Sequence, residues 1–263
     1  MDTGVRPQLL NELDEEDVQK YINDDSWCAQ EKMDGRRRIL IKGQKGTFGA
    51  NRKGLEVPVD EKMKIELESI FPHVILDGED MGDHVRVFDR IDLADKAYIL
   101  RYEQLLLIMK DWFKTLIIVP TAWTSSEKQA LYDKLKKDNA EGIVFKNINS
   151  MYTPGRPNSG GDQLKFKFTQ SASVIAGSVT KGKRSVEMWV YDAIGVRVSV
   201  GNVTVYPNQE IPKRGAILEV KYLYLYPGGS LFQPVLLQER DDLHEDDCKY
   251  EKLKIKQSQE EEI

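Results

Sequence analysis

The stretch "QEKMDGRRR", residues 30–38, lies at the centre of the pattern that decides the fold. It predicts a strand, a tight turn at Asp-Gly and a second strand, "RILI", that ends at Gly43. A strand that runs into a turn exposes its side chains, and here Lys32 stands beside three arginines. One lysine among several cations is typical of a reactive amine. Taken alone, Lys-x-Asp-Gly is weak, because it arises by chance about once in ten chains of this length. A surface hairpin with a solvated lysine is the alternative.

Strands and helices alternate around this stretch up to about residue 168. The turn-rich residues 46–58 predict a hairpin, and hydrophobic spacing predicts helices over 58–72, 98–113 and 125–139. Short apolar runs predict strands over 73–80, 85–92 and 115–120. Ser126 and Gln129 could form a capping box on the third helix. The aromatic face of the second helix, with Tyr98 and Tyr102, is expected in the core rather than around a ligand.

The pattern changes after residue 168. Five strand-like runs without helical period occupy 173–182, 184–195, 196–205, 216–226 and 231–240. Five antiparallel strands in roughly 70 residues fit a small closed barrel such as an OB-fold. We therefore predict an α+β chain with three parts: a first domain at 1–168 with mixed and antiparallel sheets and helices, an all-β OB-fold domain at 169–250, and an acidic, disordered tail at 251–263.

Charge is distributed unevenly along the 263 residues. The formal net charge is −5, but residues 1–25 carry −6, residues 239–263 carry −5 and the body between them carries +6. A basic body permits phosphate binding, although solvated charge that keeps a protein soluble is the alternative. The two cysteines, Cys28 and Cys248, lack disulfide or zinc-site spacing, which favours a reducing, cytoplasmic compartment. No secretion signal or membrane span is expected.

A series of motifs accompanies the lysine in a fixed order. "NRKG" at 51–54, "LDGE" at 76–79, "VFD" at 87–89, "EGIVFK" at 141–146 and "YTPGRPNSGGDQLKFK" at 152–167 follow it. Together they resemble the motifs of the covalent nucleotidyltransferases, most closely the ATP-dependent DNA ligases, over residues 26 to 240. The resemblance implies a minimal two-domain ligase of phage or viral type, with an adenylation domain, an OB-fold, ATP as AMP donor and Mg²⁺ or Mn²⁺.

The resemblance also implies roles for individual residues. It makes Lys32 the nucleophile that carries AMP. Further catalytic roles fall to Asp34, Arg37, Lys165 and Lys167. Nucleotide binding falls to Gln30, Arg37, Arg52, Glu79, Phe88, Lys146, Lys165, Lys167 and Arg240, with Gln30 reading adenine and Phe88 stacking on it. Glu79 and Glu141 would hold a metal ion or ribose hydroxyls.

These residue types suit the chemistry independently of the family. A lysine attacks phosphorus only as a free amine, and nearby cations favour that form. The same cations stabilise negative oxygens that develop during transfer, and carboxylates suit Mg²⁺. Lys165 and Lys167 alternate with apolar residues, so a strand would direct both ammonium groups to one face.

Two positions depart from the family pattern. Asn51 stands where Ser or Thr is commoner, and Leu243 stands where ligases tend to place a lysine that helps orient pyrophosphate. The resemblance implies that the partner is nicked duplex DNA or a hybrid duplex. The protein is expected to act as a monomer and not to bind a membrane. Other interpretations are an RNA or RNA/DNA-hybrid ligase, a messenger-RNA capping guanylyltransferase that would carry GMP, and a non-catalytic nucleic-acid binder.

Overall fold

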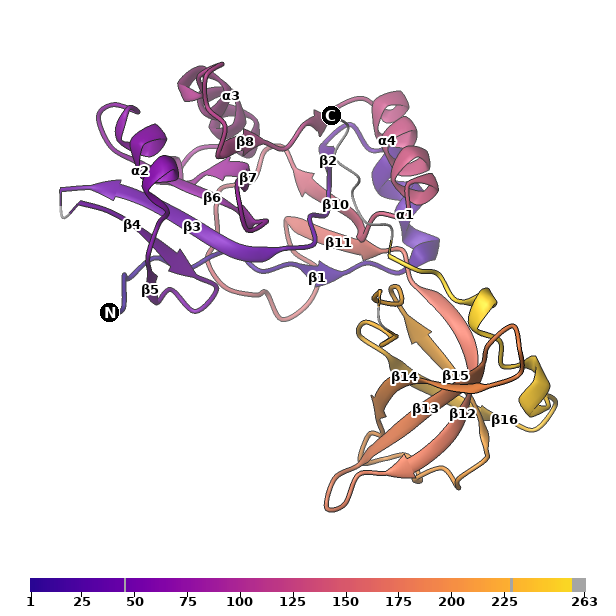
Figure 1. Cartoon of the computed structure of the whole chain (residues 1–263). Coiled ribbons are helices and arrows are strands. Elements are labelled where there is room, and N and C mark those ends of the chain that lie inside the picture. The colour runs from indigo at the N-terminus through magenta and orange to yellow at the C-terminus, as the bar shows by residue number, and fades with distance from the viewer. Residues whose placement is uncertain (45, 228, 257–263) are drawn as a thin grey trace. The chain divides into compact units, whose positions relative to one another are not determined.

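The chain folds into two compact units, Met1–Lys167 and Phe168–Ile263 (Figure 1). The structure is a computed structural model that describes residues 1–44, 46–227 and 229–256. The boundary lies one residue before the predicted one. Mixed sheets with helices make up the N-terminal unit, as the predicted fold class requires.

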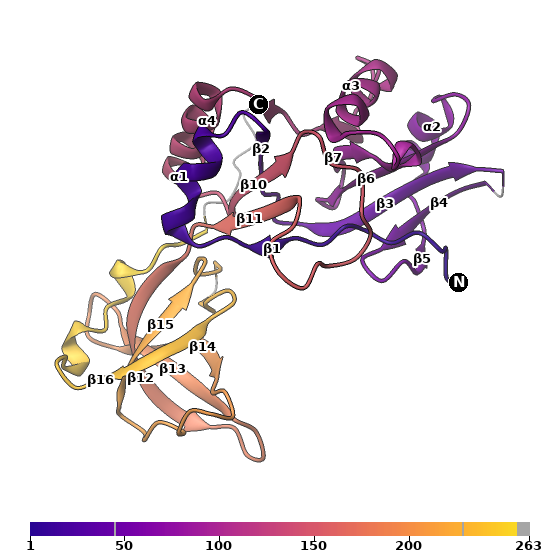
Figure 2. The ribbon, with the colours of Figure 1, turned by 180° about the vertical axis from the view of Figure 1, so that it is seen from behind.

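One sheet of the N-terminal unit has five strands in the order β1-β11-β10-β2-β9. Its strands are β1 (Asn11–Glu12), β2 (Trp27–Glu31), β9 (Thr121–Ala122), β10 (Gly142–Asn147) and β11 (Gln163–Lys167). Only β1 and β11 pair in parallel among these neighbours. Helices α1 (Glu15–Asn23) and α4 (Ser125–Lys137) contact each other and β2, and both views show them side by side against this sheet (Figures 1 and 2).

A second sheet has six strands in the order β5-β4-β3-β6-β7-β8. Its strands are β3 (Arg36–Gly43), β4 (Gly46–Asn51), β5 (Glu56–Val57), β6 (Val74–Asp80), β7 (Val85–Arg90) and β8 (Leu116–Ile118). Helices α2 (Glu61–Glu68) and α3 (Tyr98–Ile108) pack on it, and a 3-10 turn, η1 (Ile91–Leu93), follows β7. Leu40, Leu67, Leu76, Tyr98 and Leu105 are fully buried in the core between the sheet and the helices.

The stretch around Lys32 links these two sheets. Strand β2 pairs with β10 and β9, whereas β3 pairs with β4 and β6. The two strands on either side of the Asp-Gly turn therefore do not pair with each other, and the surface-hairpin alternative is wrong. Because the chain leaves one sheet and enters the other here, Lys32 lies where the two sheets meet.

The predicted helices form, but four of their ends differ from the predictions: both ends of α2 and the C-terminal ends of α3 and α4. Helix α2 begins after Asp60, whose side chain accepts from the Lys62 amide. Helix α3 ends at Ile108, because Met109 is extended, several residues before the predicted end. The capping box of α4 is formed by Thr124 and Glu127, so the pair predicted at 126 and 129 is wrong. The short elements α1 and β1 were not predicted.

The C-terminal unit is a closed barrel in the order β12-β13-β14-β16-β15. Its strands are β12 (Gln170–Val179), β13 (Ser185–Tyr191), β14 (Arg197–Thr204), β15 (Ile217–Tyr222) and β16 (Val235–Arg240). Alternate residues such as Val186, Met188 and Val190 fill its interior, as period-two strands require. All five predicted strands are present.

The predicted disordered tail is wrong in its first part. Two 3-10 turns, η2 (Glu245–Asp247) and η3 (Tyr250–Lys252), follow the barrel, and Leu253 is buried in the barrel core. The Leu225 amide donates to the Lys254 carbonyl, which ties this segment to the barrel. Residues 257–263 lie outside the described residues.

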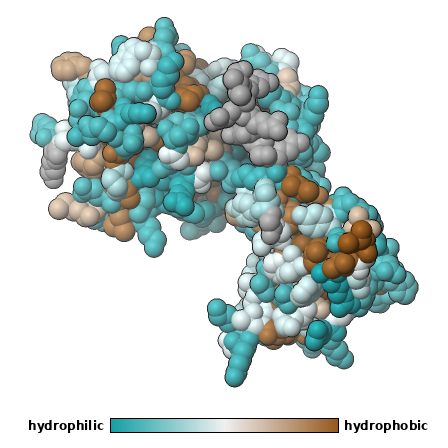
Figure 3. Space-filling model, viewed as in Figure 1, coloured by the Kyte–Doolittle hydropathy of each residue, from teal (hydrophilic) through white to brown (hydrophobic). Residues whose placement is uncertain are grey.

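The surface agrees with this packing. The face of the N-terminal unit in Figure 3 is largely hydrophilic, since its apolar residues are collected between sheets and helices. Among the described residues, no helix is long and apolar enough to cross a membrane.

Candidate active site

One face of the five-stranded sheet carries four of the predicted site residues, Gln30, Lys146, Lys165 and Lys167. Gln30 pairs with Val144, and Val144 pairs with Lys165, so these three residues form one row across β2, β10 and β11. Two residues further along β10, Lys146 pairs with Gln163, and two residues before Val144, Gly142 pairs with Lys167. Because alternate residues of a strand share a face, these rows point to the same side of the sheet.

Lys32 lies at the edge of this face and is held by a carboxylate. Its Nζ atom is 2.5 Å from Oε2 of Glu141, and its amide donates to the Gly142 carbonyl at 3.0 Å. Oε1 of Glu141 lies 3.7 Å from Nζ of Lys167. Glu141 is buried, and burial lowers the pKa of Lys167. The predicted nucleophile, the predicted metal-binding acid and one predicted cation therefore form one cluster.

Arg37 enters the site from the other sheet. Its guanidinium binds the buried carboxylate of Asp77 through two hydrogen bonds of 2.6 Å each. Such two-point pairing fixes the plane of the guanidinium. Arg37 also lies 4.8 Å from the ring centroid of Phe88, and Lys146 lies 4.6 Å from the same centroid. Two cations therefore lie close to the ring of Phe88, which lines the smaller cavity.

Burial shifts the protonation of two site residues. It raises the pKa of Glu79 to about 7, against the opposing effect of Arg37 and Lys32. It lowers the pKa of the Lys146 ammonium to about 8. Within the described part of the chain, the Glu79 carboxylate has no hydrogen bond or ion pair. A half-buried carboxylate without such a partner, in the lining of a cavity, is suited to a ligand hydroxyl or a cation.

Two adjoining cavities, of about 80 and 430 Å³, contain these groups. Both are lined by Leu10, Lys32, Arg37, Glu79 and Lys165. The smaller cavity adds Gln30, Phe88, Lys146 and Gln163, and the larger adds Arg36, Asn51, Arg52 and Arg156. Gln30 donates through Nε2 to Oγ1 of Thr121 at 2.8 Å. Most of the predicted residues are therefore brought to one place.

Among the described residues that line the two cavities, four predicted ones are missing, namely Asp34, Glu141, Lys167 and Arg240. Asp34 is half-buried in the segment after Lys32 and is not among the described residues that line either cavity. Arg240 ends β16 of the barrel, where it binds Asp242 at 2.5 Å and Glu219 at 3.5 Å.

The sequence did not reveal several residues of the site. Asp77 belongs to the "LDGE" motif but was interpreted only as part of a buried strand. Arg156 follows the proline-glycine turn of the last motif, and its position beside Pro and Gly was the available signal. Gln163 ends a polar loop and gave no signal. The acidic N-terminal residue Glu12, whose Oε1 lies 3.3 Å from Nζ of Lys165, was counted only as net charge.

The shifted pKa of Glu79 gives a testable stability effect. Its pKa is about 7 in the folded chain and near 4.5 when exposed, so folding is disfavoured once the carboxylate ionises. This penalty is absent below pH 4.5, grows as pH rises and is complete above pH 7. Glu79→Gln should therefore be more stable than the parent at pH 8, by at most about 3 kcal/mol. The gain should vanish at pH 4.5. Urea unfolding at both pH values would measure it, and an equal difference at both would contradict the assignment.

Comparisons with known proteins agree with this arrangement. No protein-family model and no curated protein sequence matches the chain. Among solved structures, a Lig E DNA ligase is 17% identical with a TM-score of 0.68, covering 90% of this chain and 99% of its own. Mycobacterial DNA ligase D complexed with ATP is 18% identical with a TM-score of 0.54, covering 94% and 99%. The ATP-dependent ligase of bacteriophage T7, also with ATP, is 15% identical with a TM-score of 0.50, covering 91% and 100%.

The chain therefore has the fold of the ATP-dependent DNA ligases. This confirms the mixed α and β fold that was predicted for the N-terminal domain.

Proposed function

We propose that the chain is an ATP-dependent DNA ligase that seals nicks in duplex DNA. The observation that carries the proposal is the position of Lys32 in the two adjoining cavities, paired with Glu141 and surrounded by Arg37, Lys165 and Lys167. A lysine that serves only solubility would have no reason to lie among buried acids and further cations.

The proposed reaction has three phosphoryl transfers. Nζ of Lys32 forms a bond to the α-phosphorus of ATP, and pyrophosphate leaves. The AMP then moves to the 5′-phosphate of the nick, which releases the lysine. Finally the 3′-hydroxyl attacks that phosphate and AMP leaves. Each step depends on positioning and charge stabilisation, which the fixed guanidinium of Arg37 and the ammonium groups of Lys165 and Lys167 can supply.

The site also suits a divalent cation. In the described part of the chain, no group of three or more His, Cys, Asp or Glu forms a complete metal site. Mg²⁺ commonly binds one or two carboxylates together with substrate phosphates, and Glu79 and Glu141 fit that donor set. When bound, Mg²⁺ or Mn²⁺ would neutralise phosphate charge.

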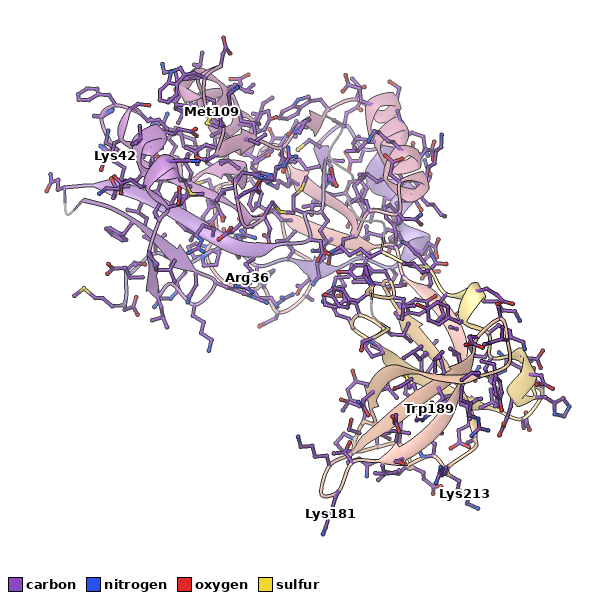
Figure 4. All side chains as sticks on the ribbon, in the orientation of Figure 1. Arg36, Lys42, Met109, Lys181, Trp189 and Lys213 are labelled. Carbon is purple, nitrogen blue, oxygen red and sulfur yellow. The ribbon has the colours of Figure 1, made fainter. Side chains whose placement is uncertain are left out.

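The barrel is proposed to be an OB-fold that binds the DNA backbone. Its strand order is that of five consecutive strands with the fourth and fifth exchanged at the closure. Residues 169–238 carry seven bases against four acids, and Lys181 and Lys213 extend away from the barrel (Figure 4). Backbone contacts of this kind predict binding that weakens as salt rises, with little sequence preference.

Covalent labelling tests the function. Incubation with α-labelled ATP and Mg²⁺ should transfer label to the protein, and Lys32→Ala should abolish it. Lys62→Ala is the matched control, because Lys62 is an exposed lysine at the start of α2. Label that persists in Lys32→Ala would mean that another residue is the nucleophile.

The same assay separates the alternatives. Label from GTP alone would favour a capping guanylyltransferase, and no label from either nucleotide would favour a non-catalytic binder. A panel of nicks with DNA or RNA on each side and in the template then distinguishes a DNA ligase from an RNA or hybrid ligase.

A further inference from the structure

Residues 7–13, here called the arm, run along the cationic side of the cavities. Figures 1 and 2 both show this segment passing along the N-terminal unit beside β11 towards α1. Leu9 and Leu10 line the larger cavity, and Leu10 lines the smaller one as well. We propose that the arm is a positioning element that holds three cavity cations in place for phosphate transfer. This inference rests on the proposed function.

Gln8 anchors the arm and reaches Arg37. Its side chain is 4% exposed, and its Oε1 accepts from Gln163 Nε2 at 3.2 Å and from the Thr153 amide at 3.3 Å. Its amide donates to the Tyr152 hydroxyl at 2.7 Å. With the backbone so fixed, the Gln8 carbonyl accepts from Nη2 of Arg37 at 3.1 Å. The Arg37 guanidinium is therefore held by the Gln8 carbonyl in addition to the Asp77 carboxylate.

The middle of the arm holds Arg156. The Nη1 atom of Arg156 donates to the Leu10 carbonyl and to Oδ1 of Asn11, the latter at 3.1 Å. Nδ2 of Asn11 donates in turn to the carbonyls of Pro157 at 3.0 Å and Gly160 at 2.9 Å. Arg156, which is exposed on a long loop, is thereby held by the arm, and the arm is itself fixed by the pairing of β1 with β11.

The end of the arm holds Lys165. Strand β1 pairs in parallel with β11, with Glu12 opposite Lys165. The Leu13 amide donates to the Lys165 carbonyl at 2.9 Å, and Oε1 of Glu12 lies 3.3 Å from Nζ of Lys165. The register therefore places the acid beside the one β11 lysine that lines both cavities.

The spacing of these three contacts suggests a common purpose. The acceptors come from every second residue of the arm: the backbone carbonyls of Gln8 and Leu10, and the side-chain carboxylate of Glu12. They bind cations from β3, from the loop before β11 and from β11 itself. A flexible lysine side chain has about 2 kcal/mol of rotamer entropy, so holding it before the reaction makes its charge more effective.

A double-mutant cycle between Glu12 and Lys165 tests this proposal. We expect Glu12→Ala to slow the labelling of Lys32 by about tenfold at saturating ATP, because Lys165 loses its restraint. In a Lys165→Ala background, Glu12→Ala should cause no further loss, since it acts only through that lysine. Glu12→Gln retains an acceptor and should restore most of the rate. Glu16→Ala, which removes an exposed acid four residues away, should label like the parent.

The outcomes separate the two proposals. If the parent protein takes no label from ATP, the proposed function fails. If the parent is labelled but Glu12→Ala is as fast or faster, or if it slows Lys165→Ala by the same factor, the positioning role of the arm is wrong and the ligase proposal stands. Thermal unfolding of each variant identifies a rate loss that merely follows from loss of folding.

Discussion

Asp77→Ala is expected to slow self-labelling by about a hundredfold and to lower the free energy of unfolding of the N-terminal unit by about 3–5 kcal/mol. Asp77 is fully buried and binds both Nε and Nη2 of Arg37 at 2.6 Å. It also accepts from the Tyr152 hydroxyl at 2.7 Å. Removal of the carboxylate leaves the Arg37 guanidinium without a counter-charge. The uncompensated charge destabilises the fold more than loss of both partners would.

The effect on labelling has a separate cause. Without Asp77, Arg37 keeps only the Gln8 carbonyl among these acceptors, so its orientation in both cavities is lost. A misplaced catalytic group can slow a reaction by about a hundredfold.

Asp80→Ala is the matched control for this prediction. Asp80 lies on the same strand and binds Arg38, but the side chains are 17% and 20% exposed. A pair that water reaches contributes less, so we expect a loss of about 1 kcal/mol and nearly normal labelling. Urea unfolding and the rate of labelling measure both effects. Equal losses in the two variants would contradict the special role of the buried pair.

Gly142→Ala is expected to reduce labelling at least about a hundredfold. A Cβ atom at this position would lie 2.0 Å from the Phe166 carbonyl oxygen and 3.0 Å from Cα of Lys167. Both are backbone atoms of the neighbouring strand, so β10 and β11 would have to separate. The separation would occur where the Gly142 carbonyl accepts from the Lys32 amide, and it would move Lys32 and Lys167 relative to Glu141.

Gly43→Ala provides the comparison. Gly43 ends β3, and a Cβ atom there would meet nothing within 4 Å. The variant should label and unfold like the parent. If Gly142→Ala labels at the parent rate, then the close approach of β10 and β11 does not fix the geometry of the site.

Local patterns predicted the elements well because they depend on residues close in sequence. The period of two in the barrel strands and the spacing of Met63 and Leu67 in α2 needed no tertiary information. Helix ends and caps were predicted less accurately: α3 ends at Ile108 because Met109 is extended, and Thr124 rather than Ser126 caps α4. The tail was misjudged because Leu253 finds a place in the barrel core, which its acidic surroundings do not reveal.

The structure brings most of the residues named from the motifs to one place, but the partners that hold them were not predicted. Lys32, Glu141 and Lys167 were each named from motifs. The alternation of lysines with apolar residues in β11 predicted that Lys165 and Lys167 share one face of the strand, as they do. The partners that hold the cations, Asp77, Gln8 and Glu12, were not named as such. Asp77 was recognised only as part of a predicted buried strand, and Glu12 only as part of the negative charge of residues 1–25.

The sequence by itself determined which chemical groups are available and on which face of each strand they lie, because a strand alternates its side chains whatever it pairs with. Only the tertiary structure decided which groups meet. Strands β2 and β3 are consecutive yet enter different sheets, and residues 8, 37 and 77 meet although long segments separate them. Strand register and sheet packing set those meetings, and neither is encoded in the spacing of any one motif.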